Sequence, residues 1–114
     1  MIETNSHKIY GLIGHPLGHS FSKDYFNRKF DAESINAEYI NYDLEDIGEL
    51  MELISETPMI GGLNVTIPYK EQVMPYLASI DDAAQEIGAV NVIKFIKDSE
   101  GELLELRGYN SDAP

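Results

Sequence analysis

The sequence predicts an α/β fold: a mostly parallel, mixed sheet with helices on both faces, in a single three-layer α/β/α domain over residues 1–114. Three observations favour this fold. Short apolar runs alternate with amphipathic stretches, which is typical of parallel strands joined by right-handed helical crossovers. The last two apolar runs are separated only by an acidic turn at 97–101, which indicates an antiparallel hairpin. The length of 114 residues fits one domain.

Five strands are predicted from their apolar patterns. The first is rich in β-branched and aromatic residues and ends at Gly-His-Pro. The second alternates, so that Tyr39 and Asn41 face one side of the sheet and their neighbours face the other. The predicted strands are 8–14, 37–44, 60–67, 89–96 and 102–109.

Four helices are predicted between these strands. Pro68 suits the first position of the third helix, because the missing N–H has no intrahelical partner there. The fourth helix starts with Ser79 or Asp81 as its cap and ends at Gly88, which tolerates the left-handed conformation after a helix. The predicted helices are 22–33, 45–56, 68–77 and 79–88.

Composition limits the classes of function. The net charge of −12 argues against nucleic-acid binding, which depends on Lys and Arg neutralising phosphates. The chain has no cysteine, so disulfides and thiolate metal sites are excluded. The N-terminus lacks the features of a signal peptide, and no apolar run approaches the roughly 20 residues of a membrane span. We therefore expect a cytoplasmic protein with no membrane partner.

The glycines after the first predicted strand do not form a nucleotide-binding loop. Gly11, Gly14 and Gly18 read G-x-x-G-x-x-x-G rather than G-x-G-x-x-G, and no G-K-[ST] follows. Pro16 also lacks the backbone N–H that a phosphate cradle uses. In sheets of this kind, ligands bind outside the carboxyl ends of the strands. That rule selects 14–22, 43–45, 64–70 and the region of 91 and 110–112.

Two serines and two histidines occupy the first of these places. Ser20 and Ser22 precede a predicted helix, where hydroxyls usually cap free N–H groups, but a pair of neutral donors there also suits a carboxylate. His15 and His19 lie four residues apart, yet Pro16 between them excludes a helical metal pair. We expect no metal site.

Five further polar residues lie in the other places. Asn64 and Thr66 point to one face of a strand, and Lys70 follows at a helix N-terminus, where the macrodipole disfavours a cation. Without further evidence, Asn64 can be a turn former, Thr66 a local cap and Lys70 a solvated lysine on a surface helix. Asn91 lies in an apolar strand, so its amide either holds a loop or meets a polar ligand. Asp112 follows the last strand in a stretch that by itself is a turn.

Taken in order, the motifs H-S-x-S, N-V-T-I-P-Y-K, G-A-V-N and G-Y-N-S-D resemble the N-terminal, substrate-binding domain of the shikimate dehydrogenase family, from about Lys8 to Asp112. The family reaction is the reversible NADP-dependent reduction of 3-dehydroshikimate to shikimate, in chorismate and aromatic amino-acid biosynthesis. The resemblance implies that three hydroxyl side chains hold the shikimate carboxylate and that two amides bind the ring hydroxyls. These residues are Ser20, Ser22 and Thr66, and then Asn64 and Asn91.

The resemblance also implies that Lys70 and Asp112 form the catalytic pair around the hydroxyl that is oxidised. A hydride leaves the carbon only if the hydroxyl proton leaves too, so a positioned acid or base is required. A lysine cation can donate the proton to the ketone or stabilise the developing alkoxide, and an aspartate beside it keeps it charged. Which of the two side chains transfers the proton stays open.

The sequence departs from the family pattern in three respects. Lys23 stands where proline is usual, and Ser111 stands where threonine is usual. The family continues into a nicotinamide-binding Rossmann domain, and these 114 residues contain no G-x-G-x-x-G. We therefore expect the N-terminal domain of a larger enzyme, with NADP bound by the C-terminal domain absent from this chain, and no turnover by this fragment alone.

Two other interpretations stay open. One is a quinate or shikimate dehydrogenase with relaxed cofactor use, because one additional hydroxyl on the substrate is a subtle difference for a pocket. The other is a non-catalytic ligand-sensing or interaction module that keeps the fold. The expected partner of the enzyme is a small-molecule substrate, shikimate or 3-dehydroshikimate, and a homodimer remains an option.

Overall fold

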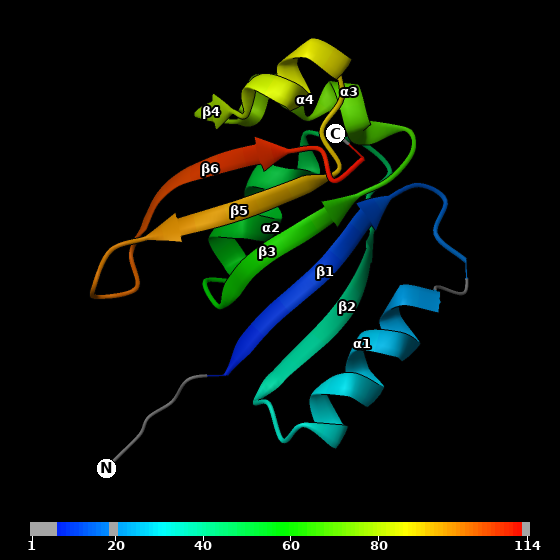
Figure 1. The fold of residues 1–114 in the computed structure, drawn as a ribbon, viewed down its shortest axis with the longest axis vertical. Helices are drawn as coiled ribbons and strands as arrows, with labels where there is room; N and C mark the ends of the chain where they lie inside the picture. Colours follow the sequence, from blue (N-terminus) through cyan, green and yellow to red (C-terminus); the bar gives the residue numbers. More distant parts are fainter. Residues whose placement is uncertain (1–6, 19–20, 113–114) are drawn as a thin grey trace.

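A six-stranded mixed sheet forms the centre of the protein (Figure 1). The computed structural model describes residues 7–18 and 21–112. The strand order is β2-β1-β3-β5-β6-β4, with β1 parallel to both β2 and β3, β5 antiparallel to both β3 and β6, and β4 parallel to β6. The strands are β1 (Lys8–Gly14), β2 (Ala37–Asp43), β3 (Ile60–Val65), β4 (Ser79–Ile80), β5 (Val92–Lys97) and β6 (Leu103–Tyr109). The predicted α/β class and the final antiparallel hairpin are confirmed.

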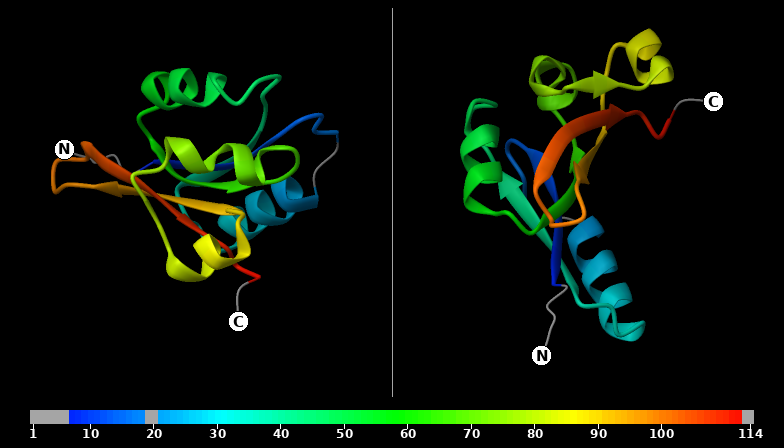
Figure 2. Two further views of the ribbon diagram at one scale, coloured as in Figure 1. Left: turned by 90° about the horizontal axis from the view of Figure 1, so that it is seen from above. Right: turned by 90° about the vertical axis from the view of Figure 1, so that its left-hand side faces the viewer.

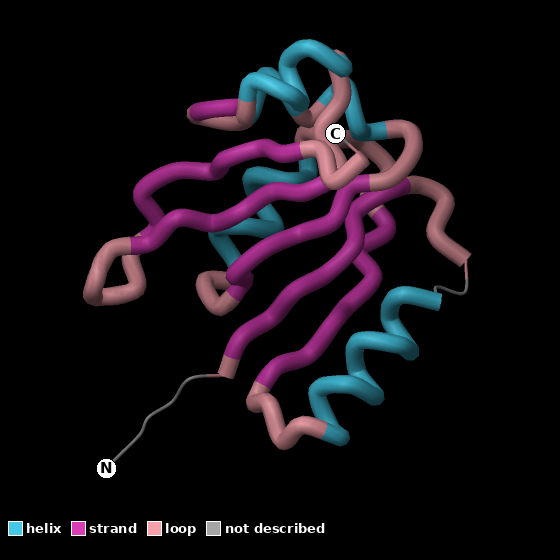
Figure 3. Tube along the Cα trace, in the orientation of Figure 1, coloured by secondary structure: helices cyan, strands magenta, loops and turns pink. Residues whose placement is uncertain are grey.

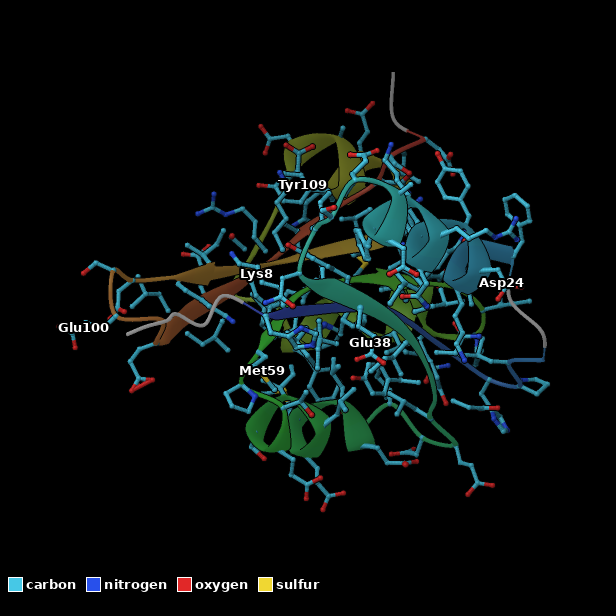
Figure 4. The ribbon with its side chains drawn as sticks, turned by 90° about the horizontal axis from the view of Figure 1, so that it is seen from below. Lys8, Asp24, Glu38, Met59, Glu100 and Tyr109 are labelled. Atoms are coloured by element: carbon cyan, nitrogen blue, oxygen red, sulfur yellow. The ribbon has the colours of Figure 1, made fainter. Side chains whose placement is uncertain are left out.

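The helices lie on both faces of this sheet. Figure 2 and Figure 4 show α1 and α2 on opposite sides of the strands. No helix of the described ranges is long and apolar enough to cross a membrane. The helices are α1 (Phe21–Ala32), α2 (Glu49–Glu56), α3 (Tyr69–Gln72), the 3₁₀ helix η1 (Met74–Tyr76) and α4 (Asp82–Ile87).

Two predicted helix boundaries are wrong for local reasons. Helix α2 begins at Glu49 rather than 45, because two side chains hold a turn before it: Asp46 accepts the N–H of Gly48 at 2.8 Å, and Glu49 accepts the N–H of Asp46 at 2.9 Å. The predicted helix 68–77 is divided into α3 and η1. Val73 lies between the two, and Pro75, inside η1, has no N–H with which to continue an α-helical hydrogen-bond pattern.

The start of the fourth predicted helix is also corrected. Asp81, not Ser79, is the cap, and its carboxylate accepts the N–H of Ala83 at 3.2 Å. Ser79 instead belongs to the two-residue strand β4, which is too short to leave a pattern in the sequence. The predicted end is confirmed, since Gly88 adopts the left-handed conformation with φ 82°.

The main core lies between the sheet and α2. Alternate residues of the central strands are buried on this side, among them Ile13, Leu63 and Ile93, and they belong to the same cluster as Leu50 of α2. Complete burial of an aliphatic side chain of this size stabilises a fold by about 1.5–3 kcal/mol. This layer holds the strands rigidly and so fixes where their ends lie.

The opposite face carries α1 and an aromatic cluster. Tyr39 of β2 stacks on Phe26 with ring centroids 5.0 Å apart. The ring centroids of Tyr10 on β1 and Phe30 are 6.1 Å apart. Asn27 binds the backbone of Tyr39 twice, because its amide donates to the carbonyl at 3.0 Å and accepts the N–H at 2.9 Å. These contacts attach α1 to the edge strand β2.

Candidate functional site

Several strand ends meet at one edge of the sheet, and Asn64, Thr66 and Asn91 lie on or next to them. This edge is formed by the carboxyl ends of β1, β2, β3 and β6 and by the amino end of β5. The connecting loops leave the sheet from this edge (Figure 3). Backbone carbonyls and side chains from distant parts of the sequence are therefore brought together. This is the position at which α/β sheets bind ligands.

Thr66 packs directly over the end of β1. Its N–H donates to the carbonyl of Ile13 at 2.9 Å. The side chain lies against Gly14, since a Cβ added to that glycine would be only 2.5 Å from Thr66 Cγ2. The close approach requires glycine at position 14 and gives the threonine a defined place beside the loop that leads to α1.

Asn64 lies on β3, half-buried, and faces the α1 side of the sheet. Its side-chain amide donates to the hydroxyl of Tyr39 at 2.8 Å. Burial raises the pKa of Tyr39, and the bond from Asn64 partly opposes that rise. An amide group has two N–H donors and a carbonyl oxygen, so this one bond leaves Asn64 with further capacity for a ligand.

Asn91 joins three segments just before β5. Its carbonyl accepts the N–H of Val65 at 2.8 Å, next to Asn64 and Thr66. Its side chain donates to the hydroxyl of Ser111 at 2.9 Å and accepts the N–H of Ser111 at 2.9 Å. The sequence left open whether this amide holds a loop or meets a polar ligand, and the structure shows that it holds a loop. One N–H of the amide remains for a ligand.

The same segment anchors the predicted catalytic pair. The carbonyl of Lys70, on α3, accepts the N–H of Val90 at 2.8 Å. Asp112 is exposed, and its N–H donates to Asn110 Oδ1 at 2.8 Å. The amide of Asn110 in turn donates to the carbonyl of Ala89 at 3.1 Å. Residues 89–91 are therefore hydrogen-bonded both to α3, which contains Lys70, and to the turn that contains Asp112.

The serine motif is described only in part. Ser22 is the second residue of α1 and is half-buried, whereas Ser20 lies outside the described residues. Of the two histidines, His19 also lies outside them, and His15 Nδ1 lies 2.6 Å from Asp43 Oδ1. No group of His, Cys, Asp or Glu in the described ranges is arranged to hold a metal ion.

Asp43 is a residue of this edge that the sequence analysis did not name, although the rule for strand ends selected positions 43–45. It is the last residue of β2, and both of its carboxylate oxygens bind the loop after β1. Oδ1 lies 2.6 Å from His15 Nδ1, and Oδ2 accepts the N–H of Leu17 at 3.0 Å. The Leu17 N–H and then the His15 imidazole hold the pKa of Asp43 below its ordinary value.

The loop after β1 does not fit a dinucleotide phosphate. Pro16 offers no N–H, the N–H of Leu17 is bound to Asp43, and that of His15 donates to the carbonyl of Ile67 at 3.1 Å. The space beside Gly14 is filled by Thr66. Two backbone N–H groups of the described part of this loop are thus bound within the protein.

An apolar groove of about 630 Å³ lies elsewhere, on the sheet face beside α1. Of the predicted site residues that the structure describes, Asn64 alone lines this groove. Its walls include Tyr10, Phe30, Ile35, Val92 and Ile96. Lys29 and Lys94 also line this groove, but most of the predicted site residues that the structure describes do not, so we assign the candidate site to the strand ends.

These features define an α/β domain of the kind that binds a small polar molecule at the carboxyl ends of its strands. Comparison with known proteins identifies the family. The family described as "Shikimate dehydrogenase substrate binding domain" matches residues 12–93. This chain belongs to that family.

Individual relatives agree with this assignment. A "Shikimate dehydrogenase (NADP(+))" from Methanosphaera stadtmanae is 42% identical over 106 residues, which cover 91% of this chain and 35% of the relative. The crystal structure of shikimate dehydrogenase 1 from Peptoclostridium difficile has a TM-score of 0.77 at 40% identity, covering 92% of this chain and 38% of that one. A Listeria monocytogenes shikimate 5-dehydrogenase, solved in complex with shikimate and NAD, has a TM-score of 0.76 at 29% identity, with 96% and 36% coverage.

The matched region is only part of each relative. The chain spans about a third of the length of the proteins it matches, between 35% and 38% in these three.

Proposed function

We propose that this chain is the substrate-binding and catalytic part of an NADP-dependent shikimate dehydrogenase, which reduces 3-dehydroshikimate to shikimate. The observation that carries the proposal is the hydrogen-bonded frame centred on Asn91. It joins the ends of β3 and β6, and the neighbouring Val90 joins α3 to them. The names of the relatives and the shikimate bound in the Listeria structure support the choice of substrate.

In this proposal the substrate carboxylate is bound by neutral hydroxyls and the ring hydroxyls by amides. Ser20, Ser22 and Thr66 bind the carboxylate, and Asn64 and Asn91 bind the ring. Neutral donors at a helix start explain how a chain of net charge −12 holds an anion. Exposed charges beyond about 8–10 Å are largely screened by salt and oppose binding little.

Lys70 and Asp112 are the proposed acid–base pair. The carbonyl of 3-dehydroshikimate needs a proton as hydride reaches its carbon, and a lysine cation can donate that proton or stabilise the alkoxide. An adjacent carboxylate favours the charged form of the lysine. Assigning the proton transfer to one member of the pair requires separate variants of each.

The nicotinamide cofactor belongs, in this proposal, to a Rossmann domain elsewhere in a longer polypeptide. The N–H groups of His15 and Leu17 in the loop after β1 are already bound within the protein, which supports that division. The proposal includes a cytoplasmic location and predicts that the 114-residue chain does not reduce 3-dehydroshikimate with NADPH by itself.

Titration of the chain with shikimate, followed by two-dimensional ¹H–¹⁵N NMR, tests the binding role. We expect saturable shifts that cluster at residues 64–70, 91 and 110–112. Thr66→Val removes one hydroxyl while keeping the shape of the side chain, and we expect it to weaken binding by about tenfold, because hydrogen bonds to charged groups contribute about 1.5–3 kcal/mol. Ser55→Ala, on the exposed side of α2, is the matched control and should bind like the wild type.

Two results would contradict the proposal. The first is the absence of saturable shifts at millimolar shikimate in the wild-type chain. The second is a set of shifts confined to the groove beside α1, since that would put the ligand on a different surface. NADPH-dependent turnover by the chain alone would overturn the proposed division between two domains.

A further inference from the structure

Asn64 has few neighbours that can hold its side-chain amide. In the sheet register it pairs with Leu12 on β1 and with Val92 on β5, and both of these side chains are apolar. Gly62, two residues earlier on the same face of β3, has no side chain. Within the described residues, the one hydrogen bond of the Asn64 side chain is the 2.8 Å bond that Nδ2 donates to the hydroxyl of Tyr39.

Tyr39 reaches Asn64 past an intervening strand and is itself firmly held. It lies on β2, and β1 separates β2 from β3 by a total of about 10 Å (Figure 1). The side chain of Tyr39 is 2% exposed and stacks on Phe26 with ring centroids 5.0 Å apart. Asn27 binds both the N–H and the carbonyl of Tyr39. Its hydroxyl is therefore a fixed point on the α1 side of the sheet.

The bond to Tyr39 also determines which atoms of the Asn64 amide are left for a ligand. It uses one N–H of Nδ2, so Oδ1 and the second N–H have no hydrogen bond to the described residues. A ring hydroxyl both donates and accepts, so this acceptor and this donor suit it. Burial raises the pKa of Tyr39, so its hydroxyl stays neutral and keeps its proton at neutral pH.

We propose that Tyr39 is a positioning residue for the recognition of a ring hydroxyl, because its own hydroxyl holds the Asn64 amide in the orientation that binds the ligand. The inference rests on the proposed function, since it concerns the same ligand and the role proposed for Asn64. Tyr39 itself does not touch the ligand. An amide that is already held loses less freedom on binding, which favours affinity by about two- to tenfold.

The test is a double-mutant cycle, measured by NMR titration of the 114-residue chain with shikimate. Tyr39→Phe removes the hydroxyl and keeps the ring that stacks on Phe26, and we expect it to weaken binding by about fivefold. Asn64→Ala removes the amide and should weaken binding at least as much. In the Asn64→Ala background, Tyr39→Phe should change the affinity little, because the group that Tyr39 holds is already gone.

Tyr10→Phe is the matched control. Tyr10 pairs directly with Tyr39 across β1 and β2 and lines the same groove, and its hydroxyl has no hydrogen bond within the described residues. We expect this variant to bind shikimate like the wild type. The side-chain NH₂ signals of Asn64 should move more in Tyr39→Phe than in the control.

The other outcomes of the cycle separate the inference from the proposed function. If Tyr39→Phe weakens binding equally with and without the Asn64 amide, Tyr39 has a general structural role and the inference is wrong. If Tyr39→Phe binds like Tyr10→Phe, the hydroxyl positions nothing and the inference is again wrong. If Asn64→Ala binds like the wild type, the role proposed for Asn64 fails, and the inference fails with it. If the wild-type chain does not bind shikimate, the proposed function itself fails.

If Tyr39→Phe does not fold, hydrogen exchange of the wild type decides. The inference requires one Nδ2 proton of Asn64 to exchange with water more slowly than in a free asparagine, both before and after shikimate binds. Exchange at the rate of free asparagine in either state would overturn it.

Discussion

A single added methyl group at Gly14 tests the geometry of the candidate site. In Gly14→Ala, the new Cβ would lie 2.5 Å from Thr66 Cγ2, 2.9 Å from Leu17 Cδ2 and 3.0 Å from the carbonyl oxygen of Ile67. Carbon atoms in contact prefer about 3.5–4.0 Å. Thr66 must therefore move by about 1 Å, because the backbone of Ile67 closes the other side.

The expected loss of stability follows from two opposing effects. Overpacking of this kind destabilises a fold by about 1–3 kcal/mol. Alanine also restricts the unfolded chain more than glycine does, which offsets about 0.4–1 kcal/mol. We expect a net loss of about 1–2 kcal/mol, or a fall of about 4–8 °C in Tm for a domain of this size.

Thermal and urea unfolding measure this loss, and two further variants give it meaning. Gly18→Ala, in the same loop, is the control, because no described residue beyond its chain neighbours lies within 4 Å of its added Cβ. Thr66→Ser removes Cγ2 and keeps the hydroxyl, so the double variant Gly14→Ala/Thr66→Ser should recover part of the stability. The reasoning is refuted if Gly14→Ala and Gly18→Ala unfold at the same midpoint, or if the serine gives no recovery.

Two other predictions concern the edge strand β2. Asn27→Ala leaves the N–H and the carbonyl of Tyr39 without their described partner, and we expect the free energy of unfolding measured in urea to fall by about 1–3 kcal/mol. The control is Arg28→Ala at the exposed neighbouring position, which should have nearly the stability of the wild type. The lowered pKa of Asp43 predicts a pH dependence: the carboxylate stabilises the fold above its unfolded-state pKa, and this contribution disappears as pH falls through the folded-state pKa, below the ordinary value of 3.8. Asp43→Asn should therefore have a flatter profile of stability against pH in that acid range, and a profile that matches the wild type would contradict the assignment.

The sequence predicted most of the layers correctly because their signals are local. Each of the five expected strands is present. Asp81 caps the start of α4 and Gly88 follows its end, as their residue types favour. The errors arose where local chemistry competed with the apolar pattern. One predicted helix continues as a 3₁₀ helix that contains Pro75, and side-chain hydrogen bonds before Glu49 delay the start of another. Strand β4 left no pattern, since its two residues pair with β6 only in the folded sheet.

By itself, the sequence determined the α/β class, the family and the set of candidate residues, because motif order and hydrophobic alternation are written along the chain. Only the tertiary structure decided which side chains share a hydrogen bond. Asp43 lies 28 residues from His15, and Asn91 lies 20 residues from Ser111. Those bonds depend on strand order and register, which pair Gly14 with Asp43, and no local pattern specifies which strand ends become neighbours.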